Sequence, residues 1–179
     1  LVFNKIDLLD ETENIKLNDI SKIYKNAGID TLSISAYLKI NLEKLLEKLL
    51  EKKTLILGNS GVGKSTLINK NSSNSKQKTD KLSIKTGRGK QTTTFSESFE
   101  INKNTQIIDS PGFKEFYFFD IKKNDLRFLY PEFKLFNDKC KFNNCLHKNE
   151  PKCSVKSAIG KSISERRYNN YLSILHELD

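Results

Sequence analysis

The order of five short motifs constrains this chain more strongly than any one of them alone. In chain order, the motifs are Asn4-Lys5-Ile6-Asp7, Ser35-Ala36, Gly58-Asn59-Ser60-Gly61-Val62-Gly63-Lys64-Ser65, Thr92-Thr93-Thr94 and Asp109-Ser110-Pro111-Gly112. In the usual arrangement of these elements the glycine-rich segment leads, and the Asn-Lys-x-Asp and Ser-Ala motifs trail. Here the two trailing motifs stand at the front. The sequence therefore predicts a circularly permuted P-loop domain.

The glycine-rich segment matches G-x-x-x-x-G-K-[ST] and lies between a strand-like run and a helix-like run. Backbone N–H groups of such a loop cradle phosphate oxygens, and the following helix adds its positive N-terminal dipole. We expect Lys64 to act on the β- and γ-phosphates in catalysis, and Ser65 to bind Mg²⁺. Thr66 completes the nucleotide-binding set. This motif predicts a nucleotide but does not identify the base.

The Asn-Lys-x-Asp motif identifies the base as guanine. A carboxylate at Asp7 can accept hydrogen bonds from both N1–H and the exocyclic amine of guanine, whereas adenine offers no such donor pair. We expect the stem of Lys5 to lie along the ring and Asn4 to tie this segment to the phosphate loop. Ser35 and Ala36 would direct a backbone N–H toward the base carbonyl. The predicted ligands are GTP and GDP.

Two further motifs have the character of switches. Asp109 follows a strand-like run, where it can hold Mg²⁺ through water, and the N–H of Gly112 can meet the γ-phosphate. One of the three threonines should close onto Mg²⁺; we assign Thr93, although spacing does not distinguish it from its neighbours. Nearby, Arg88 and Lys90 are either phosphate or RNA contacts or part of a solvated loop.

A compact set of metal-type ligands lies near the C-terminal end of the sequence. The ligands are Cys140, Cys145, His147 and Cys153. Three thiols and one imidazole complete a tetrahedral Zn²⁺ site with no open position, so we expect one structural zinc ion. The alternative is three buried free cysteines and a surface histidine.

The pattern of apolar residues indicates an α/β fold with a parallel-type sheet, followed by a small helical zinc-binding domain. Buried strands are expected at 1–3 and 55–57, further strands at 31–35, 95–101 and 105–109, and helices at 14–27, 41–53 and 164–178, with another helix beginning at 64–69. We place the GTPase domain at 1–119 and the zinc domain at 120–179. The chain has no Met and opens within a strand, which predicts a fragment lacking its N-terminal part.

Charge and composition limit the kinds of partner that this chain can have. The 179 residues carry a net charge of +9 with a pI near 9.3, which favours a polyanionic partner, although a lysine-rich solvated surface would give the same balance. No apolar run reaches the roughly 18 residues of a membrane span, and no secretory signal is visible. We expect a cytoplasmic monomer in a reducing compartment with no membrane partner.

On these motifs the chain resembles the ribosome small subunit-dependent GTPase A family, the circularly permuted bacterial GTPases of 30S subunit maturation. The resemblance covers essentially the whole chain and rests on the motif order, the Gly87-Arg88-Gly89-Lys90-Gln91 run before the threonines, and the Cys-x4-Cys-x-His-x5-Cys spacing. Glu150-Pro151-x-Cys153-x-Val155 and Arg167-Tyr168-x-x-Tyr171-Leu172 continue it.

The resemblance implies GTP hydrolysis stimulated by the small subunit, binding to the 30S subunit and 16S rRNA, and a role in late assembly. It also implies an upstream OB-fold domain, which this sequence lacks. The chain departs from the family at Gln91, where His is common. Because Phe113 follows Gly112 and cannot hydrogen-bond, the resemblance implies that Gln91 positions the attacking water; the alternative is that ribosomal RNA supplies this group.

Three functional classes remain from the sequence. The first is a Mg²⁺-dependent GTPase that acts as a ribosome-assembly factor. The second is a GTP-gated RNA-binding module with little intrinsic catalysis. The third is a GTP-gated interaction protein with a non-ribosomal partner, which the zinc-ligand pattern disfavours.

Overall fold

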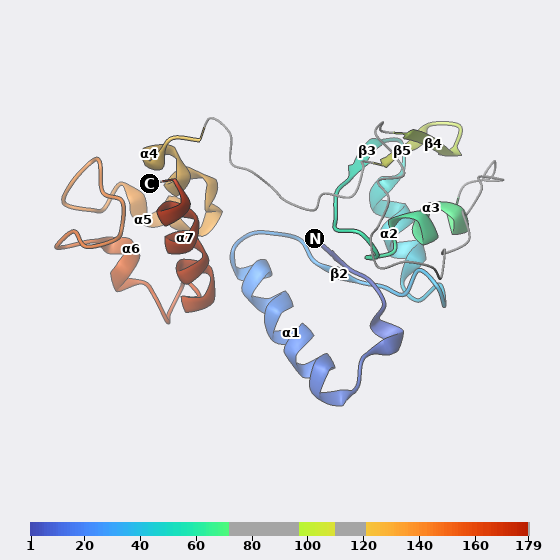
Figure 1. The fold of residues 1–179 in the computed structure, drawn as a ribbon, viewed down its shortest axis with the longest axis horizontal. Helices are drawn as coiled ribbons and strands as arrows, with labels where there is room; N and C mark the ends of the chain where they lie inside the picture. The colour runs from blue at the N-terminus through green and yellow to red at the C-terminus, as the bar shows by residue number, and fades with distance from the viewer. Residues whose placement is uncertain (72–96, 110–120, 179) are drawn as a thin grey trace, which may run out of the picture. The chain divides into compact units, whose positions relative to one another are not determined.

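The computed structural model describes residues 1–71, 97–109 and 121–178 (Figure 1). The chain folds as two compact units. The sheet unit comprises Val2–Asp10 and Leu32–Phe116, and the helical unit comprises Leu1, Glu11–Thr31 and Tyr117–Asp179. This division assigns Glu11–Thr31 to the helical unit, and the domain boundary near residue 120 stays a prediction.

The sheet unit contains short parallel pairings. Strands β1 (Val2–Phe3) and β2 (Leu32–Ser33) form one parallel pair. In a second sheet, β3 (Lys53–Ile56) runs parallel to β5 (Thr105–Asp109), and β4 (Glu97–Asn102) pairs antiparallel to the other edge of β5. The register places Ile56 opposite Asp109. The predicted α/β class with a parallel-type sheet is confirmed.

Three helical elements complete the described part of the sheet unit: η1 (Ile6–Leu8), α2 (Leu42–Leu49) and α3 (Lys64–Asn71). Helix α2 buries Leu42, Leu45 and Leu49, the apolar stripe that its spacing predicts. It ends earlier than predicted. Leu50 adopts an extended backbone with ψ 135°, so its side chain is 48% exposed.

Two strands that the sequence predicts to be buried are largely exposed. Leu1 and Val2 are 52% and 44% exposed, and Leu55 and Leu57 are 53% and 51% exposed. The reason for Leu55 is that burial alternates along β3, so the two faces of the strand differ. One face carries the half-buried Thr54 and Ile56, and Leu55 lies on the other face.

The helical unit begins with α1 (Glu11–Asn26), which starts three residues before its predicted range of 14–27 and ends at Asn26, just before Gly28, the predicted helix terminator. Gly28 has φ +78°, the left-handed conformation that favours glycine after a helix. The remaining elements are α4 (Lys123–Leu126), η2 (Arg127–Leu129), η3 (Pro131–Phe133), α5 (Lys134–Asn137), α6 (Ser154–Ser157) and α7 (Glu165–Glu177). The final helix matches its predicted range of 164–178 closely.

An aromatic core holds the helical unit together. Phe133 and Tyr171 are fully buried, with ring centroids 5.0 Å apart, and Tyr130 packs against both. The Arg167 guanidinium forms a two-point ion pair with Glu132, a carboxylate that is nearly fully buried, and lies 5.0 Å from the Tyr130 ring centroid. Aromatic burial and a satisfied ion pair thus compensate for short helices.

Several predicted switch residues lie outside the described residues. They are Gln91, the threonines Thr92, Thr93 and Thr94, and the segment Ser110-Pro111-Gly112. What the sequence predicts for them stays a prediction. Within the described ranges, no helix combines the length and the apolar character that crossing a bilayer requires.

Candidate functional site

Asn4 joins three of the sequence motifs at one point. Its side-chain amide donates a hydrogen bond to the carbonyl oxygen of Val62 in the phosphate loop (2.9 Å). Its Oδ1 accepts a hydrogen bond from the N–H of Ala36 (2.9 Å). A single amide therefore links segments 58 and 32 residues away, and the predicted tie between the first motif and the phosphate loop is present.

The phosphate loop needs glycine where Asn4 approaches it. Gly63 has φ +99°, and a Cβ atom there would overlap the side-chain amide nitrogen of Asn4. Gly61, with φ +78°, has open space where a side chain would begin. Glycine at 61 is thus required by backbone conformation alone, whereas glycine at 63 is required by both conformation and space.

The Ser-Ala motif is held in a tight turn beside this point. Ser35 is fully buried, exchanges backbone hydrogen bonds with Ile40, and accepts a hydrogen bond at Oγ from the N–H of Leu38 (3.0 Å). The N–H of Ala36, predicted to face the base carbonyl, donates to Asn4 in this structure. Its contact with a base stays a prediction.

Asp7 has an unsatisfied oxygen. It lies in η1, after Lys5, whose backbone is left-handed with φ 69°. The Oδ1 atom of Asp7 is buried and has no hydrogen-bond partner. Because a buried acceptor without a donor costs free energy, this oxygen fits a ligand that brings N–H groups to it. The guanine Watson–Crick edge supplies two.

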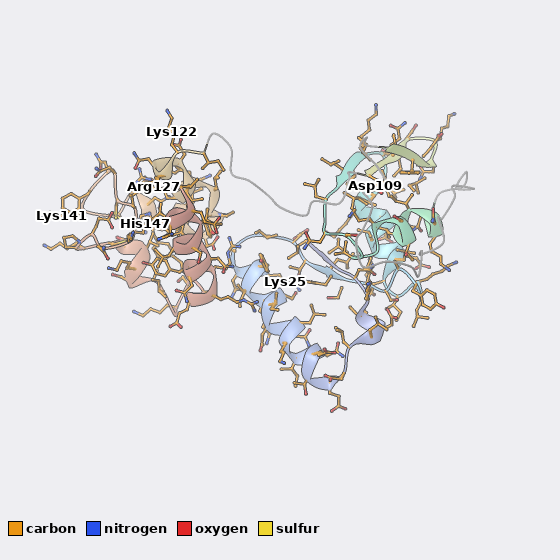
Figure 2. The ribbon with its side chains drawn as sticks, in the orientation of Figure 1. Lys25, Asp109, Lys122, Arg127, Lys141 and His147 are labelled. Atoms are coloured by element: carbon orange, nitrogen blue, oxygen red, sulfur yellow. The ribbon has the colours of Figure 1, made fainter. Side chains whose placement is uncertain are left out.

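Lys64, which the sequence predicts to act on the phosphates, points its side chain back onto the glycine-rich loop. The Lys64 ammonium donates to the carbonyl oxygens of Gly58 (2.6 Å) and Asn59 (3.1 Å). Ser65 follows it in the first turn of α3, where backbone N–H groups have no partner within the helix. Asp109 ends β5 next to the end of β3, the strand that leads into the loop (Figure 2). These residues therefore share one edge of the sheet, where α/β folds bind ligands.

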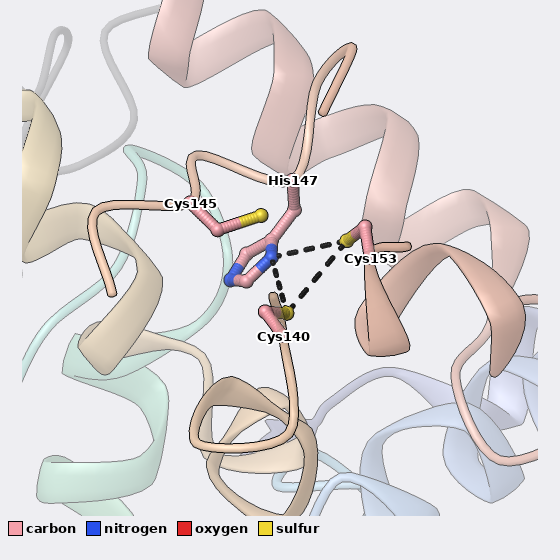
Figure 3. A group of neighbouring side chains, drawn as sticks. All are labelled: Cys140, Cys145, His147 and Cys153. Atoms are coloured by element: carbon pink, nitrogen blue, oxygen red, sulfur yellow. Dashed lines mark hydrogen bonds between the residues drawn. The ribbon is translucent and has the colours of Figure 1, made fainter. Parts of the chain in front are cut away.

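The four metal-type ligands of the helical unit converge (Figure 3). The ligand atoms of Cys140, Cys145, His147 and Cys153 all lie within 4.8 Å of one another, and the last three residues are buried. His147 Nδ1 lies 3.3 Å from Cys153 Sγ and 3.7 Å from Cys140 Sγ, and the two sulfur atoms are 4.0 Å apart. Tetrahedral zinc bonds would separate neighbouring ligand atoms by about 3.5–3.8 Å. The set therefore fits one zinc ion.

A second layer of side chains orients the ligands. His147 Nε2 donates to Oδ1 of Asn137 (2.9 Å), which leaves Nδ1 to face the cysteines. The Tyr168 hydroxyl donates to the carbonyl oxygen of His147 (2.6 Å), and Arg127 donates to that of Cys145 (3.0 Å). Both bonds fix the backbone of the segment between the second and third ligands.

Glu150 anchors the same segment. Its carboxylate accepts hydrogen bonds from the N–H groups of Leu146 (2.7 Å), Lys148 (2.8 Å) and Asn149 (3.0 Å). Burial alone would raise the pKa of Glu150, but these backbone donors outweigh it and lower the pKa. The loop is therefore organised around a carboxylate that stays ionised.

Burial also sets the protonation of the ligands. It raises the pKa of Cys145 to about 12 and lowers the pKa of His147 to about 4. A neutral imidazole is the form that binds metal, whereas the thiol must lose its proton to do so. A metal that binds this cluster must therefore displace thiol protons, as zinc does.

Sequence reasoning found the four ligands but missed the second layer. No spacing rule marks Asn137, three residues before the first cysteine. Glu150, Tyr168 and Tyr171 belong to the motifs that carry the family resemblance, but the sequence assigned no role to them. The structure gives Tyr171 one, because its hydroxyl donates to the carbonyl oxygen of Leu146 (2.8 Å).

The fold and the two sites define a class, a circularly permuted P-loop GTPase domain joined to a zinc-type helical module. A family model described as RsgA GTPase matches residues 1–119, and the chain belongs to this family. A relative from Flavobacterium psychrophilum, named small ribosomal subunit biogenesis GTPase RsgA, is 43% identical over 176 residues, which are 98% of this chain and 54% of that protein.

Two solved structures share the fold. The crystal structure of YjeQ from Thermotoga maritima has a TM-score of 0.77 at 34% identity, covering 99% of this chain and 58% of that one. YloQ, described as a circularly permuted GTPase, has a TM-score of 0.76 at 25% identity, covering 99% of this chain and 55% of that one. These matches confirm the permuted fold that motif order predicts. The chain spans about half the length of the curated relatives it matches.

Proposed function

We propose that this chain binds GTP with Mg²⁺, hydrolyses it, and acts with the small ribosomal subunit during its assembly. The observation that carries the proposal is the Asn4 amide. It joins the base-reading segment to Val62 of the phosphate loop and to Ala36, while Asp7 keeps a buried oxygen for guanine. A nucleotide would meet base-reading and phosphate-binding groups that are already connected.

Each residue has a distinct task in this proposal. Asp7 would accept hydrogen bonds from guanine, and Lys64 would exchange its two loop carbonyls for phosphate oxygens. Ser65 and Asp109, with Thr93, would hold Mg²⁺, which neutralises charge on the phosphates. Gln91 would orient the attacking water with its amide, which can both donate and accept. The task of the cysteine cluster is structural, because four protein ligands leave no open position on one zinc ion.

The partner is supported by the relatives and by charge. The name of the Flavobacterium protein refers to biogenesis of the small ribosomal subunit. The net charge of +9 suits 16S rRNA, whose phosphates attract lysine-rich surfaces. A second candidate is a GTP-gated RNA-binding module with little intrinsic catalysis. It is favoured by Phe113, which stands where many GTPases carry the water-positioning glutamine.

Two measurements test the proposal. Asp7→Asn should shift preference from GTP toward XTP, because an amide can donate to the second carbonyl of xanthine and no longer accepts from both guanine donors. An unchanged GTP-to-XTP affinity ratio would remove the assignment of Asp7. Single-turnover hydrolysis with and without 30S subunits then separates the two candidates, since turnover that stays negligible with 30S subunits supports the RNA-binding module.

A further inference from the structure

A hollow of about 480 Å³ lies beside the cysteine cluster in the helical unit. Its polar walls carry three lysines and three serines, namely Lys139, Lys152, Lys161, Ser154, Ser157 and Ser162. Cys153 also lines it, so the hollow shares a wall with the metal-type site. Its lining residues, all within the described part of the chain, include no aspartate or glutamate.

Two of these lysines are positioned by the metal-ligand segments. Lys139 and Lys152 each directly precede a cysteine of the cluster. The Ser154 hydroxyl donates to the carbonyl oxygen of Lys139 (2.6 Å), and the N–H of Lys141 donates to the carbonyl oxygen of Lys152 (3.3 Å). The two segments are therefore cross-linked at the hollow, which keeps both lysines on one concave surface.

We infer that this hollow binds a phosphate group of a nucleic-acid backbone. Three lysines line one concave surface whose lining residues include no carboxylate, so the surface attracts an anion, and lysine binds phosphate as a point charge. The hydroxyls of Ser154 and Ser157 already donate to backbone carbonyls, so the lysines carry the recognition. Ser162 can add a hydroxyl donor.

The surroundings favour a nucleic acid over an acidic peptide. On the same ligand loop, the Lys141 ammonium lies 5.2 Å from the ring centroid of Phe142, whose side chain is 39% exposed (Figure 2 labels Lys141). An exposed ring beside cations offers a face on which a base can stack. Residues 121–178 hold twelve Lys and Arg against six Asp and Glu, a surplus that suits a repeating polyanion. This inference rests on the proposed function only in taking RNA as the polyanion.

The test compares two variants of the full chain with equal charge. K139Q/K152Q/K161Q neutralises the hollow, and K134Q/K148Q/K156Q removes the same charge elsewhere on the helical unit. The probe is a fluorescently labelled RNA hairpin, titrated between about 50 and 200 mM salt. We expect the first variant to bind at least about tenfold more weakly than the second, and its salt slope to fall by about 0.7–0.9, the change for one lost phosphate contact.

Equal losses in the two variants would show diffuse attraction and overturn the site. Displacement of RNA by polyglutamate at matched charge would assign the hollow to an acidic peptide instead. Binding of inorganic phosphate to the hollow, with RNA affinity unchanged in the first variant, would assign it to free phosphate. Either result overturns the nucleic-acid assignment.

Two controls separate this inference from folding and from GTP hydrolysis. Zinc content and thermal melting should match between the variants. If the triple substitution loses zinc, Lys161→Gln against Lys156→Gln repeats the comparison outside the cysteine-flanking positions. Basal GTP hydrolysis should be unchanged in both variants. Absence of hydrolysis in the unmodified chain would contradict the proposed function but leave the RNA comparison intact.

Discussion

The two sites of this molecule are built in opposite ways. In the sheet unit, segments far apart in sequence meet through hydrogen bonds, and Asp7 keeps a buried oxygen without a partner. In the helical unit, four ligands within 14 residues are packed into a core, where the ring of His147 lies edge-on to Phe133 at 5.7 Å. The first arrangement waits for a ligand that arrives and leaves. For the second we propose a permanent ligand on which the local fold depends.

The difference in packing supports this contrast. Leu55 and Leu57 remain about half exposed beside the phosphate loop. The helical unit, by contrast, buries His147 completely and Cys145 and Cys153 almost completely, which gathers three thiols and an imidazole in the interior in an arrangement that one zinc ion fits. Loss of nucleotide should therefore leave the sheet unit folded, whereas loss of metal should unfold the ligand loop.

The largest expected effect comes from removing the metal. Cys140→Ser, or a strong zinc chelator, should unfold the segment around residues 138–155, because structural zinc contributes on the order of 10–16 kcal/mol in small domains. Native mass spectrometry should first show one zinc ion per chain. Circular dichroism should then show loss of structure in the variant.

GTP affinity is the control for this prediction, because the nucleotide site lies in the other unit. Affinity within about twofold of the unmodified chain would support the contrast between the units. A parallel loss of GTP binding would show that the sheet unit depends on the metal as well. Metal-free protein with an unchanged spectrum would contradict a structural role for the cluster.

The next largest effect is expected at Gly63. Gly63→Ala should weaken GTP binding by at least about 100-fold, roughly 2.7 kcal/mol, because the new methyl displaces the Asn4 amide from the phosphate loop. Gly28→Ala is the matched control. It strains a left-handed backbone at φ +78° with nothing within 4 Å of the new methyl, and it should leave GTP affinity unchanged.

A double-mutant cycle identifies the mechanism. In an Asn4→Ala background, Gly63→Ala should reduce GTP affinity much less than it does in the unmodified chain, because the amide that the new methyl displaces is already absent. Additive effects of the two substitutions would show that backbone strain, and not the Asn4 contact, makes glycine necessary at this position.

The two units also differ in how much of their structure could be predicted from the sequence. The phosphate loop and the cysteine set were predictable because backbone geometry or coordination number fixes their residue types and spacing. The exposure of Leu55 was not predictable, because an apolar run does not reveal which face of its strand is covered. The role of Asn137 was not predictable either, since it depends on which ring nitrogen of His147 faces the cysteines, and only three-dimensional contacts show that.

Asn137 gives the third prediction. Asn137→Ala should weaken zinc binding by about 10- to 100-fold, because the imidazole of His147 loses the acceptor that fixes its orientation. Competition with a zinc chelator measures this. Asn137→Asp keeps an acceptor oxygen and should recover most of the affinity, whereas a loss equal to that of alanine would mean that Asn137 acts through packing.

The smallest effect tests whether the nucleotide site supplies all of its own chemistry. Gln91→Ala should lower 30S-stimulated GTP turnover by about tenfold, roughly 1.4 kcal/mol of barrier, with GTP affinity nearly unchanged. An amide can orient water by donating and accepting hydrogen bonds, and Phe113 cannot replace it. Lys103→Ala, in the exposed turn between β4 and β5, is the control and should retain turnover. Turnover in Gln91→Ala equal to that of the unmodified chain would assign the task to ribosomal RNA, and the sheet unit would then depend on its partner for catalysis.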